Sequence, residues 1–236
     1  MTKARRLVAV SLSLLLAACG PRDDGRVDPA RYDAFFLWAG VRPQPVLGKA
    51  KVVYLLAGEV RRQGTPVLAP LRSTPNVRQG EVWLTVRTDR LDWDERTWGQ
   101  VLNQMAIWQA KGNRLAGLQI DFDASTRGIA GYAGFLRQAR QRLPSRYRLS
   151  VTGLMDWSVN GDSKAVSQLR GVVDEVVIQT YQGRNTIPGY EAYLRRLSDF
   201  PVPFRIALVQ QGDYREPAGL RSNPRFRGYV VFLVNP

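Results

Sequence analysis

Two carboxylic acids, Asp121 and Asp123, stand two positions apart at the end of an apolar run, in the stretch 117–126. In an extended strand alternate side chains point to the same face, so Gln119, Asp121 and Asp123 share one face. Two carboxylates that lie close together repel each other, so the pKa of one should rise and that group should hold a proton near neutral pH. The pair therefore predicts a site with a general acid.

Further polar and aromatic residues either share this face of the same run, as Gln119 does, or stand at or near the ends of other apolar runs. The candidates for substrate binding are Gln119, Trp38, Arg87, Asp156, Trp157 and Gln182. Aromatic faces with amides and carboxylates are the mixture that carbohydrate sites use, because flat apolar rings pack on sugars and polar groups bind hydroxyls. The plainer interpretation makes Trp38 and Trp157 core aromatics and joins Asp121 to Arg87 in a structural ion pair.

Eight apolar, β-branched and aromatic runs supply the strands that would position these residues. They lie at 32–41, 51–60, 81–89, 115–124, 147–157, 175–183, 204–211 and 228–235. Most are apolar on both faces, which is typical of strands that are buried on both sides.

Segments with helical spacing lie between several of these runs. The clearest has Asp92 as its N-cap with Glu95 three residues on, and Gly112 as its stop; its apolar face is Trp98, Leu102, Met105 and Trp108. A second follows Thr126, with Ile129, Tyr132, Phe135, Leu136 and Leu143. A short third is expected from Ala165 to Leu169, and a fourth, with Tyr190, Tyr193, Leu194 and Leu197, before Pro201.

Alternation of strands and helices is typical of parallel βα units, and a series of eight predicts an α/β fold of the closed (β/α)₈ TIM-like barrel type. An open doubly wound parallel sheet is the alternative. Residues 42–50 and 61–80, after the first two strands, are interrupted by Pro and Gly, so we expect a trimmed barrel with incomplete outer helices there. The working face of such a barrel lies at the carboxyl ends of its strands, which places Asp121 and Asp123 at its mouth.

The amino-terminal segment predicts export. A basic start and an apolar run over residues 1–18 are typical of a signal peptide, and Leu16-Ala17-Ala18-Cys19 resembles a bacterial lipobox with Cys19 as the lipidated residue. The plainer alternative is a short anchor helix with an incidental Cys. Residues 19–31 are expected to be a lipidated tether and 32–236 a single barrel domain. We expect a lipoprotein anchored through its lipid on the periplasmic side, and Gly20 after Cys19 favours the outer membrane.

Charge and composition narrow the partners. The formal net charge of +14 falls to +11 when Lys3, Arg5 and Arg6 leave with the signal peptide. In an exported protein this positive charge favours anionic envelope polymers as partners over nucleic acid. The plainer explanation is that the charge serves only to keep the protein soluble. The chain has 0 His, so His-dependent nucleophile sets are excluded, and we expect no metal and no cofactor. The single Cys excludes an internal disulfide.

The run Ala116-Gly117-Leu118-Gln119-Ile120-Asp121-Phe122-Asp123 resembles the fourth-strand signature of family 18 glycoside hydrolases, Asp-Gly-x-Asp-x-Asp-x-Glu. The resemblance implies that Asp123 is the acid that protonates the leaving oxygen and that Asp121 orients the acetamido group of the substrate, which attacks in place of an enzyme nucleophile. Gln179-Thr180-Tyr181-Gln182 resembles the family's Met-x-Tyr-Asp, which implies a stabilising role for Tyr181.

The departures from that signature bear on activity. Two Asp positions are Ala116 and Gln119, the Glu position is the shorter Asp123, the Asp after Tyr181 is Gln182, and the eighth-strand Trp corresponds to Phe232. A shift of about 1 Å at the acid costs roughly a hundredfold in rate.

The chain from Tyr32 onward is more similar to the bacterial domain of unknown function 3142, with a Tyr-Asp-Ala-Phe-Phe-Leu-Trp-Ala-Gly opening and a Leu-Gln-x-Asp-Phe-Asp centre followed by Thr126. This resemblance implies a glycosidase-like barrel without an established activity. Two hypotheses remain: an envelope glycoside hydrolase with Asp123 as acid, or a non-catalytic barrel that binds glycan at the same mouth.

Overall fold

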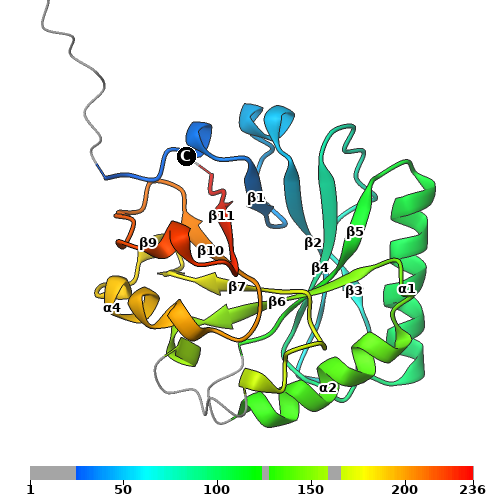
Figure 1. Cartoon of the computed structure of the whole chain (residues 1–236). Coiled ribbons are helices and arrows are strands. Elements are labelled where there is room, and N and C mark those ends of the chain that lie inside the picture. The colour runs from blue at the N-terminus through cyan, green and yellow to red at the C-terminus, as the bar shows by residue number, and fades with distance from the viewer. Residues whose placement is uncertain (1–24, 124–127, 159–165, 236) are drawn as a thin grey trace, which may run out of the picture.

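Eight parallel strands form the body of the protein in a computed structural model that describes residues 25–123, 128–158 and 166–235 (Figure 1). The strands are β1 (Ala34–Leu37), β2 (Val52–Val60), β4 (Glu81–Thr88), β5 (Leu115–Asp121), β6 (Arg148–Leu154), β7 (Glu175–Gln179), β10 (Phe204–Val209) and β11 (Phe226–Phe232). Each falls within or closely overlaps one of the eight predicted runs, so the strand predictions are confirmed.

The sheet closes on itself. The strand order runs β1, β11, β10, β7, β6, β5, β4, β2, and β1 also pairs with β2. Phe35 of β1 has Val231 of β11 as its partner on one side and Val53 of β2 on the other. The predicted closed α/β barrel is thus confirmed, and the open doubly wound sheet is wrong because no barrel strand is left with a free edge.

Three α-helices are described. They are α1 (Glu95–Ala110), α2 (Ile129–Arg142) and the short α4 (Tyr190–Leu194), which continues as a 3₁₀ helix over Arg195–Asp199. The cap of α1 is Asp94, whose carboxylate accepts the Thr97 N–H at 2.8 Å. The predicted cap Asp92 is wrong, because its carboxylate pairs with Arg90 instead.

The helices cover only part of the barrel. In Figure 1, α1 and α2 lie outside the strands that flank β5, whereas the segments after β1 and β2 hold no α-helix. The first forms a 3₁₀ helix at Pro45–Lys49, and the second forms only the two-residue strand β3 (Ala69–Pro70), antiparallel to β2. The expected trimming after the first two strands is therefore confirmed.

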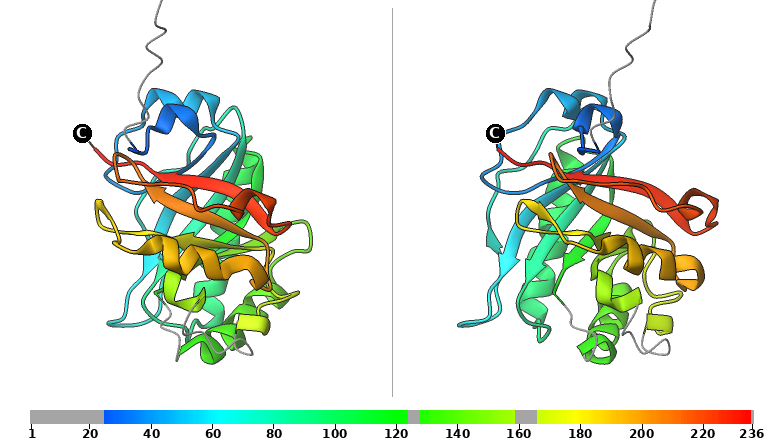
Figure 2. Two further views of the ribbon diagram at one scale, coloured as in Figure 1. Left: turned by 60° about the vertical axis from the view of Figure 1, so that its left-hand side comes forward. Right: turned by 90° about the vertical axis from the view of Figure 1, so that its left-hand side faces the viewer.

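Short elements complete the rest of the described chain. A hairpin of β8 (Tyr181–Gln182) and β9 (Asn185–Thr186) follows β7, and 3₁₀ turns lie at Pro29–Arg31, Met155–Ser158 and Leu220–Ser222. Figure 2 shows only short helical turns beside β10 and β11. Within the described ranges no helix is both long enough and apolar enough to cross a membrane.

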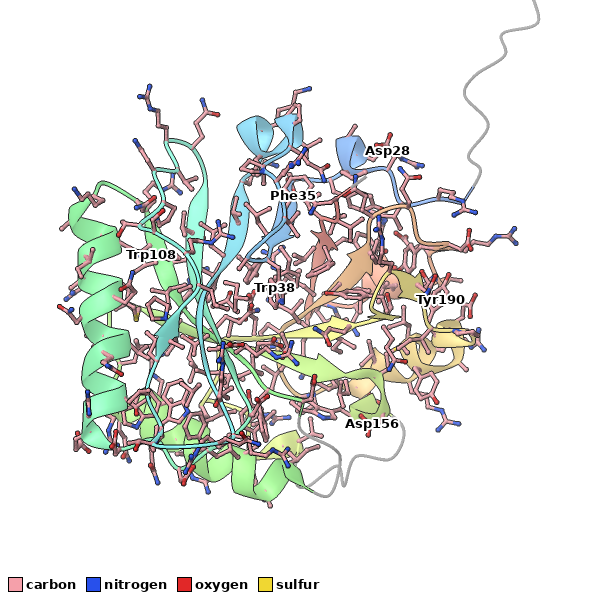
Figure 3. The ribbon with its side chains drawn as sticks, turned by 180° about the vertical axis from the view of Figure 1, so that it is seen from behind. Asp28, Phe35, Trp38, Trp108, Asp156 and Tyr190 are labelled. Carbon is pink, nitrogen blue, oxygen red and sulfur yellow. The ribbon has the colours of Figure 1, made fainter. Side chains whose placement is uncertain are left out.

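Side chains of the strands divide between two cores. Leu118 and Ile120 of β5 join the outer core beneath the helices, together with Trp108 of α1 and Phe35 of β1, which Figure 3 labels. The inner core fills the lumen with Ala34, Phe36, Tyr54, Trp83, Ala116, Val177, Ala207 and Val230. The alternation predicted for β5 is confirmed, since Gln119 is fully buried on the inner face.

A buried polar cluster fills the lumen near the amino ends of the strands. The Tyr54 hydroxyl donates to one Glu175 carboxylate oxygen at 2.5 Å, and Arg205 Nε donates to the other at 3.2 Å. Burial and the nearby Glu175 raise the pKa of Tyr54 well above its ordinary value, so the phenol stays protonated and serves as a donor. Tyr54 and Glu175 are both buried at this end of the lumen.

The described part of the expected tether packs on the barrel. Val27 is buried, its N–H donates to Gly212 O at 2.9 Å, and Gln211 N–H donates to Val27 O at 2.9 Å. Residues 25–31 therefore belong with the folded domain here. The signal segment, Cys19, Thr126 and Ala165 lie outside the described residues.

Candidate active site

A cavity of about 610 Å³ opens at the carboxyl ends of the barrel strands. We call it the mouth cavity; its lining is Trp38, Arg87, Asp121, Asp123, Leu154, Gln179, Tyr181, Gln182, Gly183, Arg184, Ile187 and Phe232. Six of the nine residues predicted for the site are therefore in one place: Asp121, Asp123, Tyr181, Trp38, Arg87 and Gln182.

Asp121 is the last residue of β5 and forms part of the cavity floor. Its side chain is almost entirely buried, with the residue 7% exposed, and one carboxylate oxygen accepts the Thr152 hydroxyl at 2.8 Å. Burial raises the pKa of Asp121 to about 6, although the Thr152 hydrogen bond and Arg87 lower it. This carboxyl therefore exchanges its proton close to neutral pH, as a group that takes part in acid–base chemistry must.

Asp123 stands two residues further along, on the same face and exposed to solvent. Its negative charge adds to the rise in the pKa of Asp121, but burial of Asp121 is the larger cause. The sequence predicts mutual repulsion as the cause of one raised pKa. In the structure the raised pKa is that of Asp121, and desolvation by burial is its largest cause.

Hydroxyl and amide groups line the lumen directly below these acids. Thr85 Oγ1 donates to Gln119 Oε1 at 3.1 Å, and Gln119 Nε2 donates to Ser150 Oγ at 3.1 Å. Gln119, a predicted substrate-binding residue, is thus fully buried and is not in the cavity lining. It supports the strands β4, β5 and β6 beneath the floor.

Thr152 is a site residue that the sequence reasoning missed. It lies on β6, two residues after Ser150, so strand alternation places both side chains on the inner face. The signal was present in the run Ser150-Val151-Thr152, where small polar residues alternate with an apolar one. That run alone, however, does not show which strand pairs with β5.

An aromatic wall of Trp38, Tyr181 and Phe232 faces the same cavity. The rings of Trp38 and Phe232 meet edge to face with centroids 5.5 Å apart, and those of Tyr181 and Phe232 lie 5.2 Å apart. Each ring is half-buried, so part of its surface remains open to the cavity. An apolar wall beside two carboxylates is suited to a sugar ring with one flat apolar face.

Tyr181 also joins the electrostatics of the acids. Burial and the nearby carboxylates Asp121 and Asp123 raise the pKa of Tyr181 well above its ordinary value, whereas a hydrogen bond with Gln179 lowers it. The phenol is therefore protonated at neutral pH and supplies a donor on the cavity wall.

Trp157 and Asp156 lie away from the mouth cavity. Trp157 is 3% exposed and its ring packs on Tyr132 of α2, with centroids 6.3 Å apart. A Cβ at Gly153 would lie 3.1 Å from this ring, so glycine at that position makes the room. Asp156 is labelled near the edge of the ribbon in Figure 3, whereas Trp38 lies near its centre. Neither Trp157 nor Asp156 is among the residues of the cavity lining, and Trp157 is the core aromatic of the plainer interpretation.

Arg87 is the direct neighbour of Asp121 in the register of β4 and β5, yet no ion pair joins these two residues. The structural ion pair proposed as the plainer interpretation is therefore absent. Arg87 is exposed and lines the cavity. Within the described ranges, no three His, Cys, Asp or Glu side chains converge as a metal site would require.

A family model described as "Domain of unknown function (DUF3142)" matches residues 82–200, half of the chain. The chain belongs to this family. The match covers β4 to the end of the segment after α4, and therefore includes Arg87, Asp121, Asp123, Thr152 and Tyr181 of the site.

Solved structures share the fold of this DUF3142 barrel at low identity. The spore cortex-lytic enzyme SleL of Bacillus cereus is 20% identical, with a TM-score of 0.50 over 75% of this chain and 49% of that one. The chitinase domain of the spore coat protein CotE from Clostridium difficile is 14% identical, with a TM-score of 0.53 over 87% and 71%. This DUF3142 chain thus spans about half the length of SleL.

A protein described as an inhibitor has the same fold. The xylanase and alpha-amylase inhibitor protein XAIP-II from Scadoxus multiflorus is 9% identical, with a TM-score of 0.51 over 85% of this chain and 92% of that one. No curated protein matches the chain. These likenesses show that this DUF3142 protein shares the barrel fold of those structures, and the chemistry has to be argued from its own residues.

Proposed function

We propose that this DUF3142 protein is a glycoside hydrolase that acts on a cell-envelope or extracellular polysaccharide, with Asp123 as the general acid. The observation that carries the proposal is that Asp121, Asp123 and Tyr181 line one open cavity of about 610 Å³ beside an aromatic wall. This volume is within the range of ligand sites. The chitinase domain of CotE, which shares the fold, supports a polysaccharide of N-acetylated sugars as the substrate class.

The proposed reaction uses the acetamido group of the substrate, as the resemblance to family 18 implies. The carboxyl proton of Asp123 moves to the glycosidic oxygen while the bond between this oxygen and C1 breaks. The acetamido oxygen bonds to C1 as the leaving group departs. Water then attacks C1, returns a proton to the Asp123 carboxylate and restores the acetamido group. Atoms and charge balance over the two steps.

Asp121 and Tyr181 are given supporting roles. The buried Asp121 carboxyl, whose pKa lies near 6, accepts the acetamido N–H when it is ionised and shares a proton with Asp123 when it is not. The Tyr181 phenol donates to the acetamido oxygen, since its raised pKa keeps it protonated. Thr152 holds the Asp121 carboxylate in place through the 2.8 Å hydrogen bond.

A second candidate is a barrel that binds glycan at the mouth cavity without cleaving it. Two observations favour it: the acid position holds Asp123, one methylene shorter than the Glu of the family 18 signature, and XAIP-II shows that the fold also occurs in a protein described as an inhibitor. The aromatic wall suits both candidates equally.

The location is also a proposal. The basic and apolar start of the chain and the Leu16-Ala17-Ala18-Cys19 sequence support export and lipidation at Cys19. An anchored protein of this kind would meet envelope polysaccharide on the periplasmic side. Metabolic labelling with a palmitate analogue tests this, since a Cys19→Ala variant would lose the label if Cys19 is the lipidated residue.

Release of reducing ends from N-acetylated polysaccharides tests the hydrolase. We expect release by the wild type, a loss of at least about a hundredfold in Asp123→Asn, and wild-type rates in Asp199→Asn. Asp199 is an exposed acid between α4 and β10, outside the cavity lining, and so is a matched control. Equal rates in Asp123→Asn and the wild type would exclude Asp123 as the acid. Retention of the polymer with no release by the wild type would establish the binding barrel instead.

A further inference from the structure

We propose that the mouth cavity selects saccharides that carry a carboxylate, as uronic acids do, and that Arg87 binds this group. The inference rests on the proposed function for the carbohydrate itself and adds the charge of the substrate. The family 18 resemblance carries no such preference. The Arg87 guanidinium lies in the cavity lining and carries this inference.

Arg87 is a cation without a partner among the described residues. It forms no ion pair and no side-chain hydrogen bond there, although most other arginines near this end of the barrel do. Arg90 binds Asp92, Arg72 donates to the carbonyls of Leu56 and Leu37 at 3.0 Å, and Arg184 donates to Asn235 O at 2.5 Å. None of the five N–H donors of the Arg87 guanidinium has an acceptor among the described residues.

The register of the sheet fixes this guanidinium beside the acids. Arg87 and Asp121 are partners across β4 and β5, so their side chains leave the sheet on the same face, about 5 Å apart at the backbone. Arg87 lowers the pKa of Asp121 through its charge, yet the two groups do not bond. A saccharide that reaches Asp121 and Asp123 therefore also covers Arg87.

Covering Arg87 has different consequences for neutral and acidic sugars. A neutral ring removes water from the guanidinium and returns only hydroxyl acceptors, which leaves a desolvated charge incompletely paired. A carboxylate accepts two parallel N–H donors from the planar fork and cancels the charge. Arg87 can therefore bind one carboxylate of the saccharide. The other cation of the cavity lining, Arg184, already donates a hydrogen bond to Asn235 O.

The competing explanation is that Arg87 serves only to tune Asp121. In that case the guanidinium would affect neutral and acidic substrates equally, because the pKa of Asp121 acts on the chemistry and not on the substituent of the sugar. The ratio of affinities for the two kinds of saccharide therefore separates the two explanations.

The experiment compares two hexasaccharides by calorimetric titration in the Asp123→Asn background, which prevents turnover. Hyaluronan hexasaccharide alternates glucuronate with N-acetylglucosamine, and chitohexaose is its neutral counterpart. We expect hyaluronan hexasaccharide to bind about tenfold more tightly or better, as a charge-assisted pair predicts. Addition of Arg87→Gln should bring the ratio of affinities to about one. Addition of Arg196→Gln, an exposed arginine outside the cavity lining, should leave the ratio unchanged.

Three results would overturn the inference. Equal affinities for the two hexasaccharides would do so and would leave the proposed hydrolase standing. A preference that falls to the same extent in Arg87→Gln and in Arg196→Gln would assign it to the overall basic surface. Binding of neither hexasaccharide would count against both the inference and the carbohydrate site.

Discussion

The Thr152 hydroxyl donates to the Asp121 carboxylate at 2.8 Å inside the barrel, across the seam between β6 and β5. This hydrogen bond opposes the effect of burial on the pKa of Asp121. The balance of the two leaves the carboxyl titrating near neutral pH, within reach of Asp123 and Tyr181 in the mouth cavity.

Thr152→Val keeps the shape of the side chain and removes the donor. We expect the pKa of Asp121 to rise by about one unit above its value of about 6, because an uncompensated buried carboxylate is harder to ionise. Carbon-13 NMR of the aspartate carboxyls through a pH titration measures this directly. Thr152→Ser, which retains the hydroxyl, is the control. An unshifted titration in Thr152→Val would show that the hydrogen bond has no bearing on the acid.

Asp121→Asn should stabilise the folded protein at neutral pH. The folded-state pKa is raised from 3.8 to about 6, so ionisation of Asp121 opposes folding, and the cost appears as pH rises through this interval. The free energy of unfolding should be higher in the variant by about 3 kcal/mol at pH 7.5 and similar to that of the wild type near pH 4. Denaturant titrations at the two pH values provide the test, and a variant that is less stable at both would contradict the proposed desolvation of Asp121.

The buried cluster at the other end of the lumen makes a separate prediction about stability. Arg205→Met leaves the Glu175 carboxylate buried with only the Tyr54 hydroxyl as a side-chain partner among the described residues, and should cost about 3 kcal/mol of unfolding free energy. Arg225→Met, at a partly buried arginine with no ion pair in the described ranges, is the control. Saccharide binding by the folded fraction should be unchanged, since the cluster is outside the cavity lining. Equal stability of the two variants would show that the Glu175 pair contributes little.

Asp123→Glu restores the side-chain length of the family 18 signature. If Asp123 is the acid and its reach limits the reaction, the added methylene should raise the rate of reducing-end release by about tenfold or more, with a smaller change in KM. Steady-state kinetics on an N-acetylated oligosaccharide measures this. A lower rate in the variant would mean that the cavity is built around the shorter acid.

Much of the fold could be predicted from the sequence, because the eight strands and the buried faces of α1 and α2 each follow a local pattern of apolar residues. The cap of α1 was misassigned because Asp92 and Asp94 are both suitable acids, and only the ion pair of Asp92 with Arg90 in three dimensions separates them. Position along a strand placed Asp121, Asp123 and Arg87 at the mouth correctly.

The direction in which a side chain points and its depth within the barrel were harder to predict. Trp157 follows β6 as a mouth residue would, but the space above Gly153 draws its ring to the outer core. Gln119 is on the predicted face but lies one layer too deep, where it binds Thr85 and Ser150. Thr152 could be predicted as a partner of Asp121 only with the knowledge that β6 adjoins β5. These features depend on contacts between segments that are distant in the sequence.

The most direct test of the account is a crystal structure of the Asp123→Asn variant with a bound N-acetylated oligosaccharide. We expect a sugar ring against Trp38 and Phe232, an acetamido group between Asp121 and Tyr181, and a glycosidic oxygen within hydrogen-bond distance of residue 123. An oligosaccharide bound elsewhere on the protein, with the mouth cavity empty, would contradict it.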